Sequence, residues 1–309
     1  MRVKLIATTP NPIDVMWTAA RTCYSAKSPV EMWEDIGYDL SQKACELYRD
    51  GKDERDAIDY AASVTDKHLK LVKVVLDSGH MSIAEHVNYT FAIEGISRAC
   101  SHQLVRHRLC TFSQQSQRYV EIKEDIDVIS GWLHQAMDGP GVEAQEEAEK
   151  ELMKICEQYF VDVNECNIVQ YAHCLYWYLK HTQQGVKAED ARNLLPNATK
   201  TNIVVTTNLR NLIHISELRL CTRAQKEIRQ LFKLIKEAVT NNNEVLGNML
   251  MAQCDRLGYC PEASKCCGKR PTLQDNLLSK ADWEQLMNAC EDPQVNEKLV
   301  KLMKMKPAF

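Results

Sequence analysis

Apolar and polar residues follow two different patterns along the chain. Short apolar stretches at 2–7 and 202–206, and a strict two-residue alternation at 87–93, predict three short strands. Pro10 and Pro12 end the first of them, because proline cannot continue a strand. The alternation at 87–93 predicts one buried face and one polar face.

Longer segments follow the helical period. Apolar residues at Leu69, Val72 and Leu76 predict an amphipathic helix over 66–76, with Gly79 at its C-terminal cap. We expect a turn at 138–141 and further helices at 13–22, from Ser97 through Arg106, 144–160, 164–180, 187–194, 207–221 and 222–252. Strands and helices do not alternate regularly, so the pattern predicts a helix-dominated α+β fold rather than a doubly wound sheet.

Two segments differ in character from the rest. Residues 31–65 are charged, helical and weakly apolar, and we interpret them as a helical insertion. Residues 253–309 begin with a concentration of cysteines and continue with amphipathic helical segments. We therefore expect one domain over 1–252 and a cysteine-rich helical C-terminal extension over 253–309.

Composition narrows the class of protein. The 309 residues are 45% hydrophobic and 26% charged, with a net charge of −4, which is typical of a soluble globular protein. A negative net charge argues against a nucleic-acid partner held by general electrostatics. No apolar run reaches the ~18 residues of a membrane helix, and the N-terminus lacks the apolar core of a signal peptide. We expect a cytoplasmic protein without a membrane partner, whose thirteen cysteines are reduced.

The most informative segment is Arg106-His107-Arg108, followed after seven residues by Ser116 and then by Arg118. The planar guanidinium group of arginine suits phosphates and planar anions. The positive charge of two neighbouring arginines lowers the proton affinity of the histidine between them. The sequence contains neither a G-x-G-x-x-G motif after a strand nor a G-x-x-x-x-G-K-[ST] motif. A bound nucleotide would therefore be held by side-chain cations and helix ends. The alternative interpretation is a solvated basic patch at a helix end.

Three other segments carry polar residues of the same kind. The first, Gly79 to His86, precedes the alternating strand; Ser82 and Glu85 in it also fit a capping box, and His80 also fits an ordinary loop. The second is Arg192 at a helix end, which alone fits a surface salt bridge. The third runs from Asn208 to Arg219, whose polar members also fit a solvated helix surface.

Together these segments resemble the flavin-dependent thymidylate synthases over roughly residues 1–245. The R-H-R-x7-S motif is specific, and the G-H-x-S-x-x-E-H and N-x-R-x-x-x-H-x-x-x-x-R segments accompany it in the same order. The resemblance implies an α+β fold with a small antiparallel sheet. It also implies conversion of dUMP to dTMP with methylenetetrahydrofolate as carbon donor, FAD as hydride carrier and NADPH as reductant. A homotetramer is implied too.

The resemblance also assigns residues to ligands. Positions matching the family's FAD site are His80, Ser82, Arg106, His107, Arg108, Gln114, Asn208, Leu209, Arg210 and His214. Positions matching its dUMP site are Gln103, Leu104, Val105, Arg106, Gln114, Gln115, Ser116, Gln117, Arg118, Arg192 and Arg219. Arg219 matches the arginine that favours ionisation at N3 of the uracil, and we expect Arg118 and the main chain around Ser116 to bind the phosphate.

The family acts without a cysteine nucleophile, so we interpret Cys110 as a packing residue. Gln114 stands where some members have Glu, and His214 where some have Asn, which leaves the individual polar contacts open but not the activity class. Two rivals remain: a nucleotide- or RNA-binding module built on the basic helix, and a member that keeps the scaffold without catalysis.

The C-terminal cysteines allow two interpretations. Four thiolates, from Cys254, Cys260, Cys266 and Cys267, could hold a structural Zn²⁺ in tetrahedral geometry. The close C-x2–4-C pairs of most zinc sites are missing, so unmetallated reduced cysteines are the alternative. Either state would affect the tail rather than the reaction.

Overall fold

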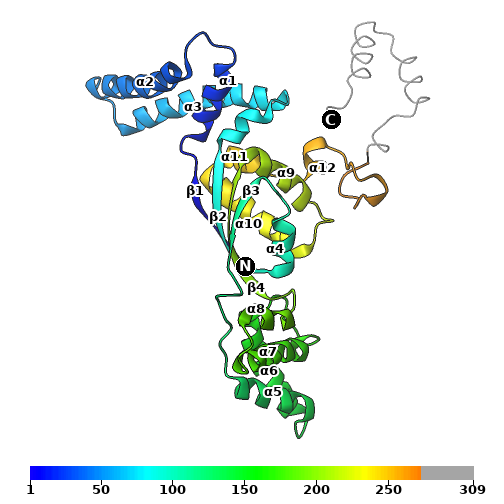
Figure 1. Cartoon of the computed structure of the whole chain (residues 1–309). Coiled ribbons are helices and arrows are strands. Elements are labelled where there is room, and N and C mark those ends of the chain that lie inside the picture. The colour runs from blue at the N-terminus through cyan, green and yellow to red at the C-terminus, as the bar shows by residue number, and fades with distance from the viewer. Residues whose placement is uncertain (273–309) are drawn as a thin grey trace, which may run out of the picture.

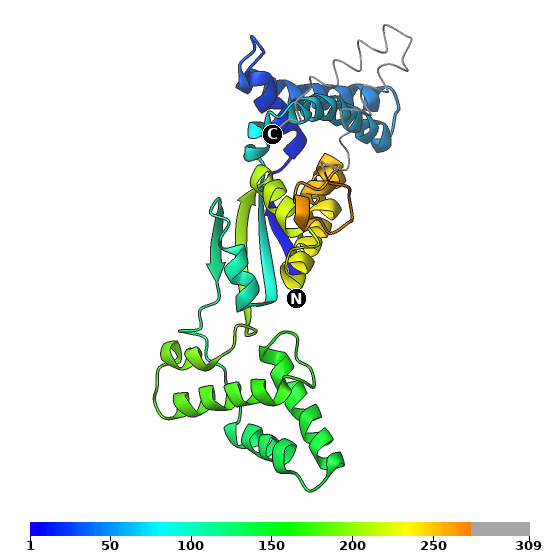
Figure 2. The ribbon, with the colours of Figure 1, turned by 90° about the vertical axis from the view of Figure 1, so that its right-hand side faces the viewer.

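The computed structural model describes residues 1–272 and arranges them in three parts along one long axis (Figure 1). Helices α1 to α3 form one end, a four-stranded sheet with its covering helices forms the middle, and helices α5 to α8 form the other end (Figures 1 and 2). The predicted C-terminal extension is described only over 253–272, and its amphipathic segments lie outside the described residues. No helix of the described part is long and apolar enough to cross a membrane.

The sheet has the strand order β1-β2-β4-β3 and is antiparallel throughout. Its strands are β1 (Arg2–Thr8), β2 (Asn88–Ser97), β3 (Cys110–Gln114) and β4 (Lys200–Asn208). Tyr89 and Phe91 of β2 are fully buried, which confirms the predicted two-residue alternation. The helix-dominated α+β class with a small antiparallel sheet is confirmed. Strand β3 was not predicted. It is short and lies at the sheet edge, where its residues alternate between half-buried and exposed and none is fully buried.

One core lies between the sheet and the helices on its buried face. It joins β2 and β4 to α1 (Pro12–Thr22), α3 (Glu54–Asp77), α9 (Leu209–Arg219) and α10 (Lys226–Asn242). The amphipathic stripe of α10, including Ile228, Leu231, Phe232 and Ile235, is fully buried there. This packing fixes α9, which begins where β4 ends, against the middle of the molecule.

The segment predicted as a helical insertion at 31–65 forms an antiparallel hairpin together with residues 66–77. Helix α2 (Pro29–Arg49) begins with a capping box between Ser28 and Glu31, and α3 begins with another between Asp53 and Asp56. The expected boundary at residue 65 falls inside α3, which continues without a break to Asp77. Helix α3 ends in a Schellman motif with Gly79 at φ +85°, so the predicted cap is confirmed.

Residues 122–198 have a core of their own. Helices α5 (Ile126–Asp138), α6 (Val142–Tyr159), α7 (Ile168–Gln183) and α8 (Ala188–Ala191) pack around residues such as Leu152, Ile168 and Leu175, and α8 continues into the 3-10 helix η2 (Arg192–Leu194). The lobe joins the middle part just before β4, where the Ala99 N–H donates to the Asn197 carbonyl at 3.0 Å.

Two predicted helices end earlier than expected. Helix α4 (Arg98–Leu104) stops before Arg106, so Gln103 and Arg106 do not share a helix face. The long helix predicted at 222–252 is broken at Asn243, whose extended backbone and side chain cap the short α11 (Glu244–Asn248). There the chain folds back so closely that a Cβ on Gly247 would lie 2.2 Å from the Thr240 hydroxyl. The helical period of the apolar residues continues through this break, so the sequence pattern did not reveal the break.

Candidate functional site

The first group of predicted site residues lies where β4 ends and α9 begins. The 3-10 helix η1 (Met81–His86) packs against α9, and Glu85 forms an ion pair with Arg210. Asn208 caps α9, because its side chain accepts the Asn211 backbone N–H at 2.9 Å. The alternative interpretation of Ser82 and Glu85 as a capping box is wrong. His80 is the N-cap of η1 and makes no capping bond through its side chain, and the Glu85 carboxylate is engaged by Arg210.

The second group joins the R-H-R segment to the end of α9. Arg219 Nε donates to His107 Nε2 at 3.1 Å, and Arg219 Nη2 donates to the Gln103 carbonyl at 3.3 Å. Because Nε2 accepts this hydrogen bond, the neutral ring carries its proton on Nδ1. His107 and the end of α4 therefore hold the Arg219 guanidinium in one orientation.

His107 is kept neutral by its surroundings. Burial lowers its pKa to about 4, with smaller contributions from the charges of Arg219 and His214. The lowered proton affinity expected from the sequence is confirmed in direction. The cause differs from the expected one. Burial lowers the pKa most, and the guanidinium that adds to the effect is that of Arg219 rather than that of Arg106 or Arg108.

Asn211 ties α9 to the chain just beyond the R-H-R segment. Its buried side-chain amide donates to Thr207 Oγ1 at 2.8 Å, to Cys110 Sγ at 3.1 Å and to the Leu109 carbonyl at 3.2 Å. These bonds fix the R-H-R turn relative to α9, which carries Arg210, His214 and Arg219. Burial raises the pKa of the Cys110 thiol, so it remains protonated, in line with its predicted packing role.

The third group lies at the opposite end of β4. Gln114 donates to Ser101 Oγ at 2.9 Å and to Thr201 Oγ1 at 3.2 Å, and Gln115 accepts from Asn202 at 3.1 Å. The Ser116 hydroxyl accepts the backbone N–H of Arg118 at 3.1 Å. Arg118, expected at the phosphate, is engaged by Glu189 of α8 at 2.6 Å.

Two arginines near this third group have no counter-ion among residues 1–272. Arg98, at the start of α4, has its pKa lowered by burial and by the charge of Arg192 on η2. Two guanidiniums that repel each other across a half-buried surface are suited to an anion such as a phosphate. Arg192 was predicted from the sequence, and Arg98 was missed.

The predicted residues differ in how they can reach a ligand. Leu104 and Leu209 are buried in the core, so only their main chains remain available. The side chains of His80, Ser82, Arg106, Arg108 and His214 are exposed, and within the described part of the chain neither Arg106 nor Arg108 forms an ion pair. Free guanidiniums and ring nitrogens beside an anchored arginine suit an anionic cofactor with a flat, hydrogen-bonding ring.

The three groups are spread along β4 rather than gathered in one cleft. Six residue steps from Asn202 to Asn208 correspond to about 20 Å, which separates the Glu85–Arg210 end from the Gln115–Arg118 end. Gln103 lies on α4, whose Ser101 contacts Gln114, and Arg219 at the end of α9 meets Gln103 and His107.

Sequence reasoning missed several residues that hold these groups. One interpretation took Glu85 as a capping residue, whereas in the structure it forms an ion pair with Arg210, 125 residues later in the sequence. Asn211 and Arg98 gave no signal beyond their residue types. Their roles depend on contacts across more than 90 residues of sequence, which no local pattern encodes.

Of the two interpretations of the C-terminal cysteines, the zinc site is not supported. Residues 1–272 contain no group of three or more His, Cys, Asp or Glu side chains that could hold a metal ion, and the cysteines described in this region are free thiols. Cys254 and Cys260 are instead buried with Ala252 against Leu220. The zinc expectation is therefore not supported.

Comparison with known proteins identifies the family of the chain. The family model of the thymidylate synthase complementing protein matches residues 4–242. A flavin-dependent thymidylate synthase of Nitratidesulfovibrio vulgaris is 38% identical over 88% of this chain and 96% of its own length. One of Pyrococcus furiosus is 34% identical over 93% of this chain and 98% of its own.

A solved structure shares the fold. It is a flavin-dependent thymidylate synthase of Helicobacter pylori in complex with FAD and dUMP, with a TM-score of 0.55 and 22% identity, covering 81% of this chain and all of the other. At this identity the likeness concerns the fold alone. The family match over most of the chain and the full-length relatives settle the membership: this chain belongs to the thymidylate synthase complementing protein family, the flavin-dependent thymidylate synthases.

Proposed function

We propose that this chain converts dUMP to dTMP, with methylenetetrahydrofolate as carbon donor, FAD as hydride carrier and NADPH as reductant. The observation that carries the proposal is the Arg219 guanidinium, which a neutral His107 and the Gln103 carbonyl hold in place beside the R-H-R segment. When bound, FAD supplies the hydride chemistry between NADPH and the methyl group that is formed.

Arg219 is the residue to which we assign catalysis. A guanidinium held beside the uracil lowers the pKa of N3–H and so raises electron density at C5, the carbon that must become a nucleophile. The geometry supports this role because two hydrogen bonds orient the Arg219 guanidinium before the substrate binds. The side chain therefore need not reorganise when the negative charge develops on the uracil. His107 acts on Arg219, and is therefore a positioning residue.

The remaining residues divide into flavin and nucleotide contacts. Exposed His80, Ser82, Arg106, Arg108 and His214, with Arg210 held by Glu85 and Asn208 at the start of α9, would bind FAD. Gln103 to Arg106, Gln114 to Arg118 and Arg192 would bind dUMP. Arg118 and the main chain around Ser116 would bind its phosphate, joined by Arg192 and Arg98. Arg106 and Gln114 belong to both sets, as the family pattern implies.

We further propose that the active enzyme is a homotetramer whose sites combine residues of several copies. The supporting observation is the ~20 Å along β4 between the Glu85–Arg210 group and the Gln115–Arg118 group, because the residues assigned to the two ligands are spread along the strand rather than gathered in one cleft. One copy would supply Arg219, and another the Arg118–Arg192 end. Location in the cytoplasm stays a prediction that cell fractionation would check.

The test is release of tritium from C5-labelled dUMP in the presence of methylenetetrahydrofolate and NADPH, with and without added FAD. FAD-dependent release together with dTMP supports the proposal. Folded, flavin-loaded protein that releases no tritium would instead favour the inactive-scaffold interpretation. An RNA-binding module would bind no flavin at all, so the absence of a yellow chromophore after FAD addition would favour that rival.

A further inference from the structure

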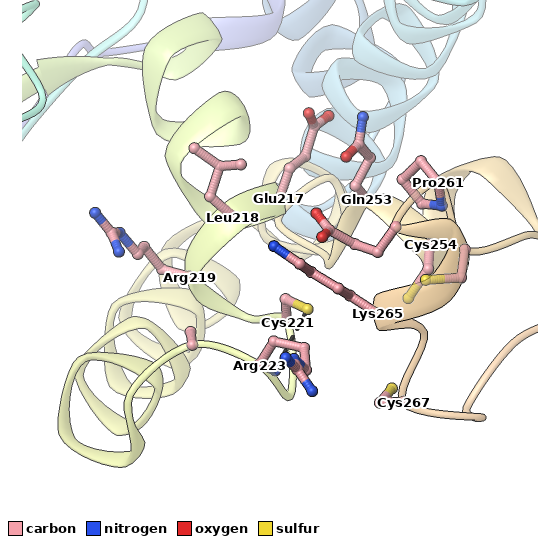
Figure 3. A pocket seen from close by; sticks show the side chains of 13 residues that line it. Glu217, Leu218, Arg219, Cys221, Arg223, Gln253, Cys254, Pro261, Lys265 and Cys267 are labelled. Carbon is pink, nitrogen blue, oxygen red and sulfur yellow. Dashed lines mark hydrogen bonds between the residues drawn. The ribbon is translucent and has the colours of Figure 1, made fainter.

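A cavity of about 310 Å³ lies between the end of α9, which carries Arg219, and the C-terminal tail. Its walls are the end of α9, the loop at 221–224, and the tail from α12 (Gln253–Leu257) to the 3-10 helix η3 (Ala263–Lys265) and Cys267. Figure 3 shows the Lys265 side chain reaching from the tail toward α9 across this space. A volume of this size is at the lower end of small-ligand sites, so it fits part of a co-substrate.

The charges around this cavity favour an anion. Arg223 and Lys265 line it, and within residues 1–272 neither of them forms an ion pair. Arg219 also borders the cavity, but its side chain points away from the other lining residues (Figure 3) and its guanidinium is bonded to His107 and Gln103. The Glu217 carboxylate in the wall is nearly buried and is already bound by Arg256 at 2.7 Å. Glu262 is the other carboxylate of the lining, so the cations outnumber the free acidic groups.

We propose that this cavity holds the anionic end of a co-substrate, either the glutamyl carboxylates of the folate or the ribose phosphate of NADPH. The inference rests on the proposed function, because it takes its ligands from that reaction. Carboxylates and phosphates share the chemistry that Arg223 and Lys265 recognise, and Leu218, Ala224 and Pro261 offer apolar contacts beside them.

Thiol footprinting tests occupancy directly, without turnover. Cys267 lines the cavity and is exposed, and a hydrogen bond from Thr222 lowers its pKa, which favours the reactive thiolate. The full-length, FAD-loaded protein is treated with iodoacetamide, alone and with NADPH, with tetrahydrofolate carrying one glutamate, or with tetrahydrofolate carrying a polyglutamate chain. Alkylation is followed by mass spectrometry, with exposed Cys45 of α2 as internal control.

We expect one ligand to slow alkylation of Cys267 several-fold while Cys45 is unaffected. Protection by polyglutamylated folate identifies the carboxylate chain, and protection by NADPH identifies the phosphate. If neither ligand changes the rate at Cys267, the proposal is overturned. dTMP formation is measured on the same preparation, so loss of the proposed function would be recognised separately from an empty cavity.

Kinetics give a second, independent test. The Arg223→Ala/Lys265→Ala double variant should raise KM for the protecting co-substrate about tenfold or more, because charged hydrogen bonds are lost. KM for dUMP and kcat should stay near their wild-type values. Lys233→Ala removes an exposed cation of α10 outside the cavity and should change none of these constants. Equal KM values in the double variant and the wild type would contradict the proposal.

Discussion

At the scale of single residues, Arg219 is the side chain on which turnover depends most. Arg219→Ala should lower kcat for dTMP formation by about 10²–10³, as removal of one oriented donor to a developing negative charge does. FAD should stay bound, because the residues assigned to it lie elsewhere on η1, the R-H-R segment and α9. Flavin absorbance after gel filtration and the rate of dTMP formation measure the two effects.

Arg55→Ala provides the matched control, since it removes an exposed arginine of α3 far from the site. It should leave both the rate and the flavin content unchanged. Wild-type turnover in Arg219→Ala would exclude the catalytic role that we assign to Arg219.

Cys110 should be dispensable despite its place beside the R-H-R segment. Its thiol is half-buried, accepts a hydrogen bond from Asn211 and has a raised pKa, so it is a poor nucleophile. Cys110→Ala should retain most of the activity, because Asn211 keeps its bonds to Thr207 and Leu109. Complete loss of turnover in a variant with an unchanged circular dichroism spectrum would point to a covalent mechanism instead.

His107 should make stability depend on pH in a defined window. Its pKa is about 4 in the fold against 6.5 in the unfolded chain, so between these values the unfolded state binds more protons. The free energy of unfolding therefore falls as pH falls from about 6.5 toward 4, and the bond from Arg219 is lost with protonation. His107→Gln keeps an acceptor but does not titrate.

The comparison uses urea unfolding at pH 7 and pH 5 for both proteins. The wild type should lose more stability between the two pH values than His107→Gln does. Identical losses would show that His107 does not carry this dependence.

At the scale of elements, the anchor of α4 is a hydrogen-bonded junction with α10. Ser97 Oγ accepts the Cys100 N–H at 2.9 Å and donates to Glu227 at 2.5 Å, while the Ser97 N–H donates to the same carboxylate at 2.6 Å. Ser97→Ala should lower the free energy of unfolding by about 1–3 kcal/mol, because a helix cap and a buried charged hydrogen bond are lost together. Chemical denaturation followed by circular dichroism measures it.

Ser101→Ala offers a comparison within the same helix. Ser101 is equally buried, but its hydroxyl bonds only a carbonyl of its own helix and the Gln114 amide. Its loss should cost less than that of Ser97. The opposite order would contradict the assignment of the α4 anchor to Ser97 and Glu227.

Elements with strong local signals were predicted from the sequence, and those defined by distant partners were not. The alternation in β2 and the glycine after α3 follow from the residues themselves, and both are confirmed. Strand β3 forms because β4, some 90 residues later, offers it an edge. The break at Asn243 exists because α11 packs back on α10 at Gly247. Within the site, the family motif gave residue identities, whereas the His107–Arg219 and Arg98–Arg192 contacts needed the fold.

At the scale of the whole molecule, shared sites make a prediction about mixed oligomers. If Arg219 and Arg192 of one site come from different copies, inactive Arg219→Ala and Arg192→Ala proteins should regain part of the activity when refolded together. Some sites in the mixed assembly then contain both arginines. Each variant refolded alone is the control, and size-exclusion chromatography gives the oligomeric state.

Absence of any regained activity in mixed assemblies of the expected size would place both arginines of a site in the same copy. That result would contradict the shared-site proposal and leave the assigned reaction untouched.

The strand order has a consequence for how the chain is made. Strand β4 lies between β2 and β3, although it is synthesised about 90 residues after β3. While the ribosome is producing the α5–α8 lobe, β3 has no strand partner and β2 can pair only with β1, so one edge of β2 and the backbone groups of β3 stay unpaired. The lobe has its own core and can fold during this interval, since domains fold as units during synthesis. The nascent chain thus has an exposed half-sheet until residue 208 has left the ribosome, and chaperones would have their main opportunity to bind it in that period.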